Sequence, residues 1–216
     1  MYKTALFDLD GTLIDSKESI TKSFQHALAS LDVNVMDADG LTKFIGPPIR
    51  EFFQEQFHLS PFETELAVKK TREYFAEHGM SGIQLYDGIP ELLCRLQNEG
   101  VRMAVATSKP TDYAEKIIEH FALERYFDLI AGSEMDGMRS GKGEIIRFAL
   151  DVLKTSLPAV MIGDRRYDMI GAREVCIDSI GVTWGYGSHS EFERSGAVAI
   201  AKTPEDLYRL IVEKNI

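Results

Sequence analysis

The sequence predicts an α/β fold, in which an open parallel sheet is covered by helices and a small helical domain is inserted after the first strand. Short apolar runs alternate with amphipathic segments after residue 82, which is typical of such a sheet. Residues 16–82 instead have helical patterns and no convincing strand. The 216 residues, 44% of them hydrophobic, suffice for one core domain that carries a smaller insertion.

The first expected strand, residues 5–7, runs into Asp8-Leu9-Asp10-Gly11-Thr12. Alternate side chains of a strand share a face, so Asp8 and Asp10 point the same way, and Gly11 permits a sharp turn. Two like charges at roughly 4 Å repel by about 4 kcal/mol at an effective dielectric constant near 20. The pair therefore needs a proton, a cation or a reaction, although an Asp-rich turn without function is the alternative for this motif alone.

Residues 16–82 are expected to form a helical domain. Capping side chains and prolines predict three helices, from Asp15 to about Leu31, from Pro48 to Phe57, and from Ser60 to Gly79. An insertion directly after the two-acid turn has the position of a cap over the edge of the sheet. The alternative is a helical domain that has no role at the site.

The rest of the chain is expected to complete the sheet. Its strands are predicted at 101–106, 127–131, 159–162, 179–182 and 197–200, and its helices at 88–98, 111–121, 142–153, 168–175 and 204–212. Right-handed crossovers place the carboxyl ends of parallel strands on one edge, where open α/β sheets bind ligands. The expected domains are therefore a core of residues 1–15 and 83–216 and a helical cap of residues 16–82.

Polar residues follow several of these strands. The hydroxyls of Thr107 and Ser108 come after the strand 101–106, where they are able to donate to an anion. Lys142 stands at a helix start, where a cation opposes the helix dipole unless an anion is bound nearby. Asp164 and Asp168 follow the strand 159–162. Each residue has a plainer alternative: strand-end capping for the hydroxyls, a solvated loop lysine, and a helix N-cap, which suits Asp168 better than Asp164.

Together these strand ends supply four carboxylates beside a lysine and a hydroxyl. Four carboxylates on one edge cannot all stay ionised without a cation, and oxygen-only ligands favour Mg²⁺ over zinc or copper. The expected metal ligands are Asp8, Asp10, Asp164 and Asp168. Because Mg²⁺ prefers phosphate oxygens, the combination indicates a phosphoryl-transfer site.

Composition limits the partners and the compartment. The net charge is 24 − 34 = −10, which argues against a nucleic-acid polymer or an anionic membrane as partner. Cys94 and Cys176 are expected to be buried free thiols in a reducing compartment. No leader pattern opens the chain and no apolar run approaches a membrane span, so a cytoplasmic protein is expected.

The ordered set D-L-D-G-T, a strand-terminal Thr, Lys and G-D-x-x-x-D resembles the haloacid dehalogenase superfamily of aspartate-nucleophile phosphatases. The resemblance spans nearly the whole chain and implies a Rossmann-like core with a small α-helical cap. Within the superfamily the chain is most similar to the phosphoglycolate phosphatase and 5′-nucleotidase-like branch, through Gly46-Pro47-Pro48 and through the segment 181–187.

The resemblance implies a role for each motif residue. Asp8 would attack phosphorus and form an aspartyl-phosphate, while Asp10 would protonate the leaving oxygen and later activate water. Thr107 and Lys142 would hold the phosphoryl oxygens. Asp164 would complete the Mg²⁺ sphere with Asp8 and the backbone carbonyl of Asp10, supported by Asp168. The expected function is Mg²⁺-dependent hydrolysis of a small phosphorylated metabolite, such as a phosphoglycolate-like ester or a nucleoside 5′-monophosphate.

Several points stay open in the sequence. Arg50 is the candidate for a carboxylate or second phosphate of the substrate, or else it is a surface arginine. Lys109 is either a rim contact or a surface residue, and Arg165 and Arg166 are expected to be solvated rather than to add potential at the site. A phosphosugar mutase that uses the same aspartyl-phosphate and a catalytically silent regulatory protein are the competing functions. The physiological substrate and the oligomeric state are not predicted.

Overall fold

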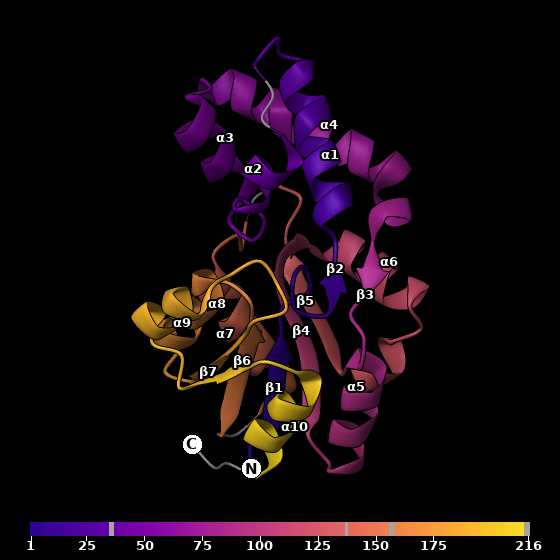
Figure 1. The fold of residues 1–216 in the computed structure, drawn as a ribbon, viewed down its shortest axis with the longest axis vertical. Helices are drawn as coiled ribbons and strands as arrows, with labels where there is room; N and C mark the ends of the chain where they lie inside the picture. Colours follow the sequence, from indigo (N-terminus) through magenta and orange to yellow (C-terminus); the bar gives the residue numbers. More distant parts are fainter. Residues whose placement is uncertain (35–36, 137, 156–157, 214–216) are drawn as a thin grey trace. The chain divides into compact units, whose positions relative to one another are not determined.

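The computed structural model describes residues 1–34, 37–136, 138–155 and 158–213. The chain forms two compact units, one of Met1–Ile14 with Leu85–Ile216 and one of Asp15–Gln84. Figure 1 shows the first unit as a sheet with flanking helices and the second as helices alone. The predicted α/β class with a parallel sheet is confirmed.

The first unit is built on a six-stranded sheet with the order β5-β4-β1-β6-β7-β8. Its strands are β1 (Thr4–Phe7), β4 (Arg102–Pro110), β5 (Leu129–Ser133), β6 (Ala159–Gly163), β7 (Asp178–Val182) and β8 (Ala199–Ala201). The paired neighbours run parallel. Each strand lies at or near its predicted position, and β4 extends four residues beyond the predicted end at 106.

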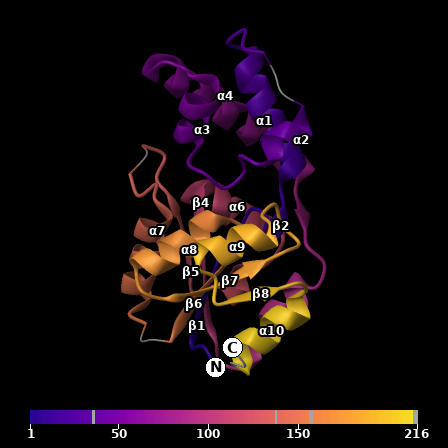
Figure 2. The same cartoon turned by 60° about the vertical axis from the view of Figure 1, so that its left-hand side comes forward.

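Helices cover both faces of this sheet. They are α5 (Ile89–Asn98), α6 (Thr111–His120), α7 (Lys142–Leu153), α8 (Arg166–Glu174), α9 (His189–Ser195) and α10 (Pro204–Val212). The chain steps outward from β1 to β5 through α5 and α6, and then returns through α7 to β6, so right-handed crossovers place α7 and α8 on the opposite face. Figures 1 and 2 show this division. Leu6, Ala104 and Met161 face α7 and α8 in a buried cluster with Ile145 and Ala149.

The register of the three central strands aligns their carboxyl ends. Phe7 on β1 pairs with Val105 on β4 and with Ile162 on β6. The residues that follow these three positions therefore emerge at the same edge. This edge lies where the strand order reverses, which is the position at which open α/β sheets bind ligands.

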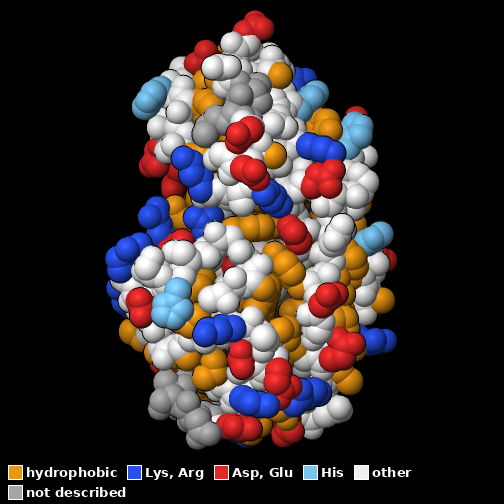
Figure 3. Space-filling view, in the orientation of Figure 1, with side chains coloured by type: hydrophobic (Ala, Val, Ile, Leu, Met, Phe, Trp, Pro, Cys, Tyr) orange, Lys and Arg blue, Asp and Glu red, His pale blue; other side chains and the backbone are white. Residues whose placement is uncertain are grey.

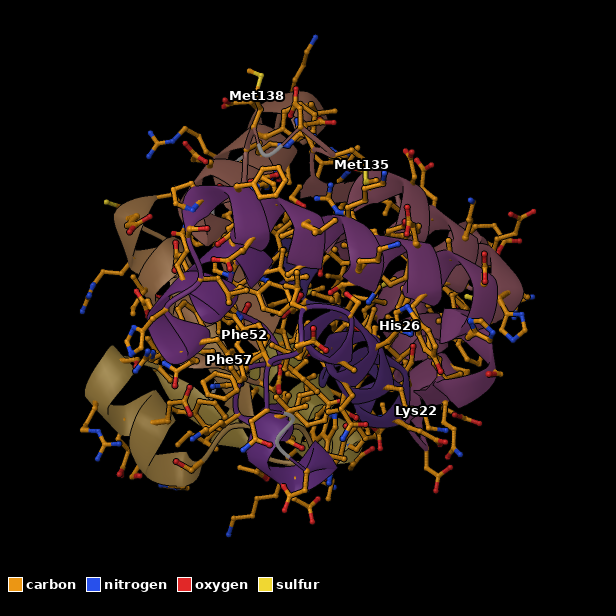
Figure 4. The ribbon with its side chains drawn as sticks, turned by 90° about the horizontal axis from the view of Figure 1, so that it is seen from above. Lys22, His26, Phe52, Phe57, Met135 and Met138 are labelled. Atoms are coloured by element: carbon orange, nitrogen blue, oxygen red, sulfur yellow. The ribbon has the colours of Figure 1, made fainter. Side chains whose placement is uncertain are left out.

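The second unit is a helical assembly with its own core. It contains α1 (Lys17–Ala29), α2 (Ala38–Thr42), α3 (Ile49–Phe57) and α4 (Pro61–His78). Phe24, Phe52 and Phe53 are buried together, with the rings of Phe24 and Phe52 4.5 Å apart between centroids. Figure 4 shows Phe52 beside Phe57 within this unit, and Lys22 and His26 on α1. The aromatic residues of α3 thus form core, as expected for apolar residues at helical spacing.

The predicted helix starts of this unit differ in detail from those observed. At α4 the Ser60 hydroxyl and the Glu63 carboxylate form the predicted capping box, and Pro61 is the first helical residue. At α1 the cap position is Ser16, and the Asp15 carboxylate accepts a hydrogen bond from the Lys17 N–H. Asp15 therefore precedes the cap residue, although its carboxylate still binds the N–H of the first helical residue.

Short elements escaped prediction. The strands β2 (Ile14–Asp15) and β3 (Gln84–Leu85) pair as a two-stranded sheet where the chain passes between the units. The helices α2 and α9 and the 3₁₀ turns at Gly79–Gly82 and Glu124–Tyr126 were also missed. Two to seven residues are too few to display a hydrophobic period, so these elements leave little trace in the sequence pattern.

The surface carries mixed charge. Figure 3 shows acidic and basic side chains interspersed on the face in view. Cys94 and Cys176 are free but exposed, so their predicted burial is wrong. Cys94 lies on the exposed face of α5, and Cys176 lies beyond the end of α8. Within the described ranges, no helix combines the length and the hydropathy that a membrane span requires.

Candidate active site

A tight turn begins the site. The Leu9 carbonyl accepts hydrogen bonds from the N–H groups of Thr12, Leu13 and Ile14, which folds the chain back after β1. Gly11 has a φ of +82°, and a Cβ at this position would overlap the Asp164 carboxylate. Glycine is therefore required here for both conformation and space. The Thr12 hydroxyl points to the same carboxylate, with its Oγ1 3.4 Å from Oδ1 of Asp164.

Asp8 and Lys142 form a buried ion pair. Nζ of Lys142 lies 3.0 Å from Oδ1 of Asp8 and 2.9 Å from Oδ1 of Asp168, and it donates to the Ala106 carbonyl oxygen at 3.1 Å. Lys142 is the first residue of α7, as predicted, and its side chain is buried. Burial alone would lower the pKa of Lys142, but the charges of Asp168 and Asp8 outweigh it and raise the pKa. The lysine is thus held as a cation between two carboxylates.

Asp164 and Asp168 follow β6 and are both fully buried. Oδ2 of Asp164 accepts a hydrogen bond of 2.8 Å from the Tyr186 N–H. Burial raises the pKa of Asp164 well above its usual range, and the nearby charges of Asp168 and Asp8 add to the rise. Oδ2 of Asp168 accepts from the Arg165 N–H at 3.0 Å, so Asp168 caps α8 while its other oxygen faces Lys142. Burial also raises the pKa of Asp168, and Lys142 opposes that rise.

Three of these side chains form a cluster with the spacing of a metal site. Carboxylate oxygens of Asp8, Asp164 and Asp168 all lie within 4.8 Å of one another. The three donors are buried and are oxygen only, which is the set that hard divalent cations prefer. The structure thus brings together three of the four predicted metal ligands through their side chains.

Asp10, the fourth predicted ligand, has a different partner. Nζ of Lys109 lies 2.8 Å from both Oδ1 and Oδ2 of Asp10. Only 6% of the Lys109 side chain and 11% of the Asp10 side chain are exposed. Lys109 is therefore neither a rim nor a surface residue but a buried ion-pair partner of the second acid. In the sequence, the position of Lys109 after a strand was the one indication of this pair.

The predicted phosphate-binding hydroxyls lie on the last residues of β4. Thr107 is buried, and its Oγ1 accepts a hydrogen bond of 3.3 Å from the Lys109 N–H. Ser108 is half-buried, and its carbonyl oxygen accepts from the Ser133 hydroxyl at 2.9 Å. Both residues lie beyond Val105, which is the residue of β4 that pairs with Phe7 on β1.

The segment after β7 packs against the turn at Gly11. The Trp184 Nε1 donates to the Thr12 carbonyl oxygen at 3.0 Å. A Cβ at Gly185 would overlap the Gly11 carbonyl oxygen and the Asp164 side chain, so the backbone approaches both closely. The sequence indicated this segment only through its resemblance to a family, and its contacts with Asp164 were not predicted.

Arg165 and Arg166 differ in their surroundings. Nε of Arg165 lies 3.3 Å from Oε1 of Glu191 on α9, and Arg165 is 8% exposed. The prediction of a solvated Arg165 is therefore wrong, because α9, which was not predicted, supplies its carboxylate partner. The Arg166 residue is exposed as expected, although its N–H donates to the same Glu191 oxygen at 2.8 Å.

Arg50 lies in the second unit, on α3. Its Nε and Nη2 donate to the two carboxylate oxygens of Glu65 on α4, at 2.6 and 3.0 Å. The Arg50 guanidinium thus binds a carboxylate of its own unit through two nitrogens, and it would bind a ligand in the same bidentate arrangement.

Comparison with known proteins identifies the family. The haloacid dehalogenase-like hydrolase family matches residues 5–182. A 5′-nucleotidase of Pseudomonas aeruginosa is 44% identical over 88% of this chain and 86% of its own length. Tyrosine-protein kinase PtkA of Mycobacterium tuberculosis is 39% identical over 90% of this chain and 67% of its own length. The crystal structure of a predicted phosphatase from Clostridium acetobutylicum superimposes with a TM-score of 0.95, at 44% identity, over 99% of each chain.

The fold and the site thus define a hydrolase of the α/β class with a carboxylate-rich centre. The chain belongs to the haloacid dehalogenase-like hydrolase family, as the ordered motifs predicted. It is similar over most of its length to proteins named for phosphate-ester chemistry.

Proposed function

We propose that the protein is a Mg²⁺-dependent phosphomonoester hydrolase that acts on a small phosphorylated metabolite through an aspartyl-phosphate. The observation that carries the proposal is the placement of Asp8 beside Lys142, Asp164 and Asp168 at the carboxyl edge of the sheet. A nucleophilic carboxylate, a fixed cation and a cluster of hard oxygen donors are what phosphoryl transfer requires.

The residues of the cluster fit a divalent cation. Burial and the charges of Asp168 and Asp8 raise the pKa of Asp164, so a bound cation would favour its ionised form, and Lys142 already faces the other two acids. Asp8, Asp164 and Asp168 would hold Mg²⁺, with the backbone carbonyl of Asp10 as predicted. When bound, the ion would neutralise phosphoryl oxygens and favour attack by a carboxylate.

The residues of the chain divide the reaction between them. An Asp8 oxygen forms a bond to phosphorus as the bond from phosphorus to the ester oxygen breaks, and Asp10 gives its proton to the departing alkoxide. Water then loses a proton to Asp10 and attacks the aspartyl-phosphate, which releases phosphate and restores Asp8. Lys142, Thr107 and Ser108 hold the transferring oxygens and stabilise their growing charge.

The second unit would act as the cap that selects the substrate. The core recognises a phosphoryl group that all phosphomonoesters share, so selectivity requires contacts outside it. Arg50 is the proposed contact for a carboxylate or second phosphate, and it would exchange its Glu65 partner for that group. A phosphoglycolate-like ester or a nucleoside 5′-monophosphate is the proposed class, in agreement with the name of the relative from Pseudomonas aeruginosa.

A phosphate-release assay tests the proposal. The panel contains phosphoglycolate, nucleoside 5′-monophosphates, sugar phosphates and pyrophosphate, each with Mg²⁺ and with EDTA. Release with Mg²⁺, none with EDTA, and none from Asp8→Asn are expected. The exposed residue Asp151 supplies the matched control, because Asp151→Asn makes the same substitution on the far end of α7.

The competing functions give different results in the same experiment. A mutase isomerises a sugar phosphate without releasing phosphate, and a silent protein binds without turnover. The kinase name of one relative adds a third arm, in which ATP and a tyrosine-containing peptide are supplied. Transfer to the peptide without hydrolysis of any ester in the panel contradicts the proposed function.

A further inference from the structure

We propose that Lys109 is a positioning residue, which fixes the orientation of the Asp10 carboxylate for proton transfer to the leaving group. This inference rests on the proposed function, because it gives Asp10 the part of general acid and base. It assigns a role to a lysine that the catalytic scheme above does not use.

The geometry of the pair supports orientation rather than simple charge balance. Nζ of Lys109 lies at the same distance, 2.8 Å, from both oxygens of Asp10, so it lies on the bisector of the carboxylate. A carboxylate held at both oxygens loses its freedom to rotate about its last bond. The side chains are 6% and 11% exposed, so solvent screens the pair far less than it screens the surface ion pairs of this chain.

The backbone around Lys109 is itself held in place. Lys109 belongs to β4, and its N–H donates to Oγ1 of Thr107 at 3.3 Å. Its carbonyl oxygen lies so close to Gly132 on β5 that a Cβ at Gly132 would overlap it. Pro110 follows and restricts the conformation of the residue before it. The lysine therefore extends from a rigid strand end, as a positioning group must.

The two acids of the opening turn thus have separate ammonium partners. Lys142 faces Asp8 at 3.0 Å, and Lys109 faces Asp10. Lys142 also contacts Asp168 and so belongs to the proposed metal and phosphoryl cluster. Lys109 contacts the acid that would exchange protons with the ester oxygen. Its removal should therefore affect the departure of poor leaving groups and leave phosphoryl binding intact.

The experiment compares two leaving groups in Lys109→Met and wild type. An alkyl ester leaves as a basic alkoxide and needs the proton from Asp10, whereas p-nitrophenyl phosphate leaves as a stable phenolate. The ratio kcat/KM reports steps up to the departure of the alcohol. For the alkyl ester that wild type hydrolyses fastest, we expect kcat/KM to fall roughly 10- to 100-fold, within the range of general acid–base effects. For p-nitrophenyl phosphate we expect less than about a threefold fall.

Two further variants test whether Lys109 acts through Asp10. Lys109→Met added to Asp10→Asn should change kcat/KM little beyond the single Asp10→Asn change, because Lys109 acts through Asp10. Lys109→Arg should restore part of the selectivity for alkyl esters. Lys116→Met, on the exposed side of α6, is the matched control and should behave as wild type. Thermal unfolding of each variant identifies any that fail to fold. If Lys109→Met fails to fold, the selectivity of Lys109→Arg between the two leaving groups decides the inference.

Two results would overturn the inference. An equal fall for both leaving groups would place Lys109 at the phosphoryl group, and full additivity with Asp10→Asn would show that it acts elsewhere. The proposed function fails separately, if wild type itself releases no phosphate from either class of ester.

Discussion

Replacing Asp164 by Asn tests the electrostatic account of the site most directly. Oxygens of Asp164, Asp8 and Asp168 lie within 4.8 Å of one another. Coulomb's law at that separation gives about 3.5 kcal/mol of repulsion per ionised pair at an effective dielectric constant near 20. The Lys142 ammonium contacts both of the other carboxylates, so it cancels about one of the two negative charges that repel Asp164. At a pH at which Asp164 is ionised, Asp164→Asn should therefore raise the free energy of unfolding of the metal-free protein by about 2–3 kcal/mol.

The increase in the free energy of unfolding that Asp164→Asn causes should depend on pH. Burial, with the charges of Asp168 and Asp8, raises the pKa of Asp164 in the folded protein. Because the folded state then binds the proton more tightly than the unfolded state does, protonation of Asp164 stabilises the folded protein. This contribution is complete below the unfolded pKa, about 3.9, and it is lost as the pH rises through the folded pKa. Metal-free wild type should thus lose stability as the pH rises from about 4 towards the raised pKa of Asp164. Asparagine has no proton to lose, so the difference between variant and wild type should be larger at pH 8 than at pH 5.

Urea unfolding followed by tryptophan fluorescence measures this difference. Trp184 is the single tryptophan of the chain and donates to the Thr12 carbonyl oxygen, so its emission reports on the core beside Asp164. Measurements in EDTA give the metal-free values. Mg²⁺ at 100 times its Kd should add about 2.7 kcal/mol to wild type and much less to Asp164→Asn.

If Asp164→Asn in EDTA at pH 8 is no more stable than wild type, the three carboxylates do not repel as the geometry implies. The exposed variant Asp151→Asn should change the free energy of unfolding by less than about 0.5 kcal/mol, which controls for the substitution itself.

Three further changes test the site at single positions. Asp8→Asn should lower turnover of every ester by more than about 10³-fold while circular dichroism stays that of wild type, and substantial remaining turnover would exclude Asp8 as nucleophile. Gly185→Ala should destabilise the core by about 1–3 kcal/mol in urea unfolding, because its methyl group overlaps the Gly11 carbonyl oxygen; an unchanged midpoint would mean that the segment moves away freely. Glu191→Gln should lower the free energy of unfolding by about 1 kcal/mol, because it removes the charge that faces the Arg165 guanidinium. An equal loss when Glu191→Gln is made in a variant without that arginine would contradict the pairing.

The sequence predicted the sheet and the placement of its polar ends well, for physical reasons. The strands of a parallel sheet are buried on both faces, so 5–7, 101–106 and 159–162 stand out as apolar runs between helical patterns. Right-handed crossovers then leave little choice for the edge at which Asp8 and Asp164 emerge. The convergence of Asp8, Asp164, Asp168 and Lys142 on this edge therefore follows from the topology.

What the sequence did not predict depends on side-chain reach and on short elements. The ion pair of Arg165 requires α9, whose seven residues lie between stronger patterns. The buried thiols were expected from residue type alone, although Cys94 lies on the exposed face of α5. Neither feature follows from hydrophobic periodicity, because that pattern locates the buried face of an element and not the partners of its polar residues.

Lys109 shows the same limit at the site itself. The predicted strand ended at residue 106, where the apolar run stops, and this placed Lys109 in a loop beyond it. In the structure β4 continues to Pro110, with an irregular register after Ala106, so Lys109 extends from a strand instead. A lysine on a rigid strand end, buried against the second acid of the opening turn, cannot simply move into water as a loop lysine would. Its contact with Asp10 is therefore a property of the resting site, and any leaving group that takes a proton from Asp10 must do so beside this ammonium.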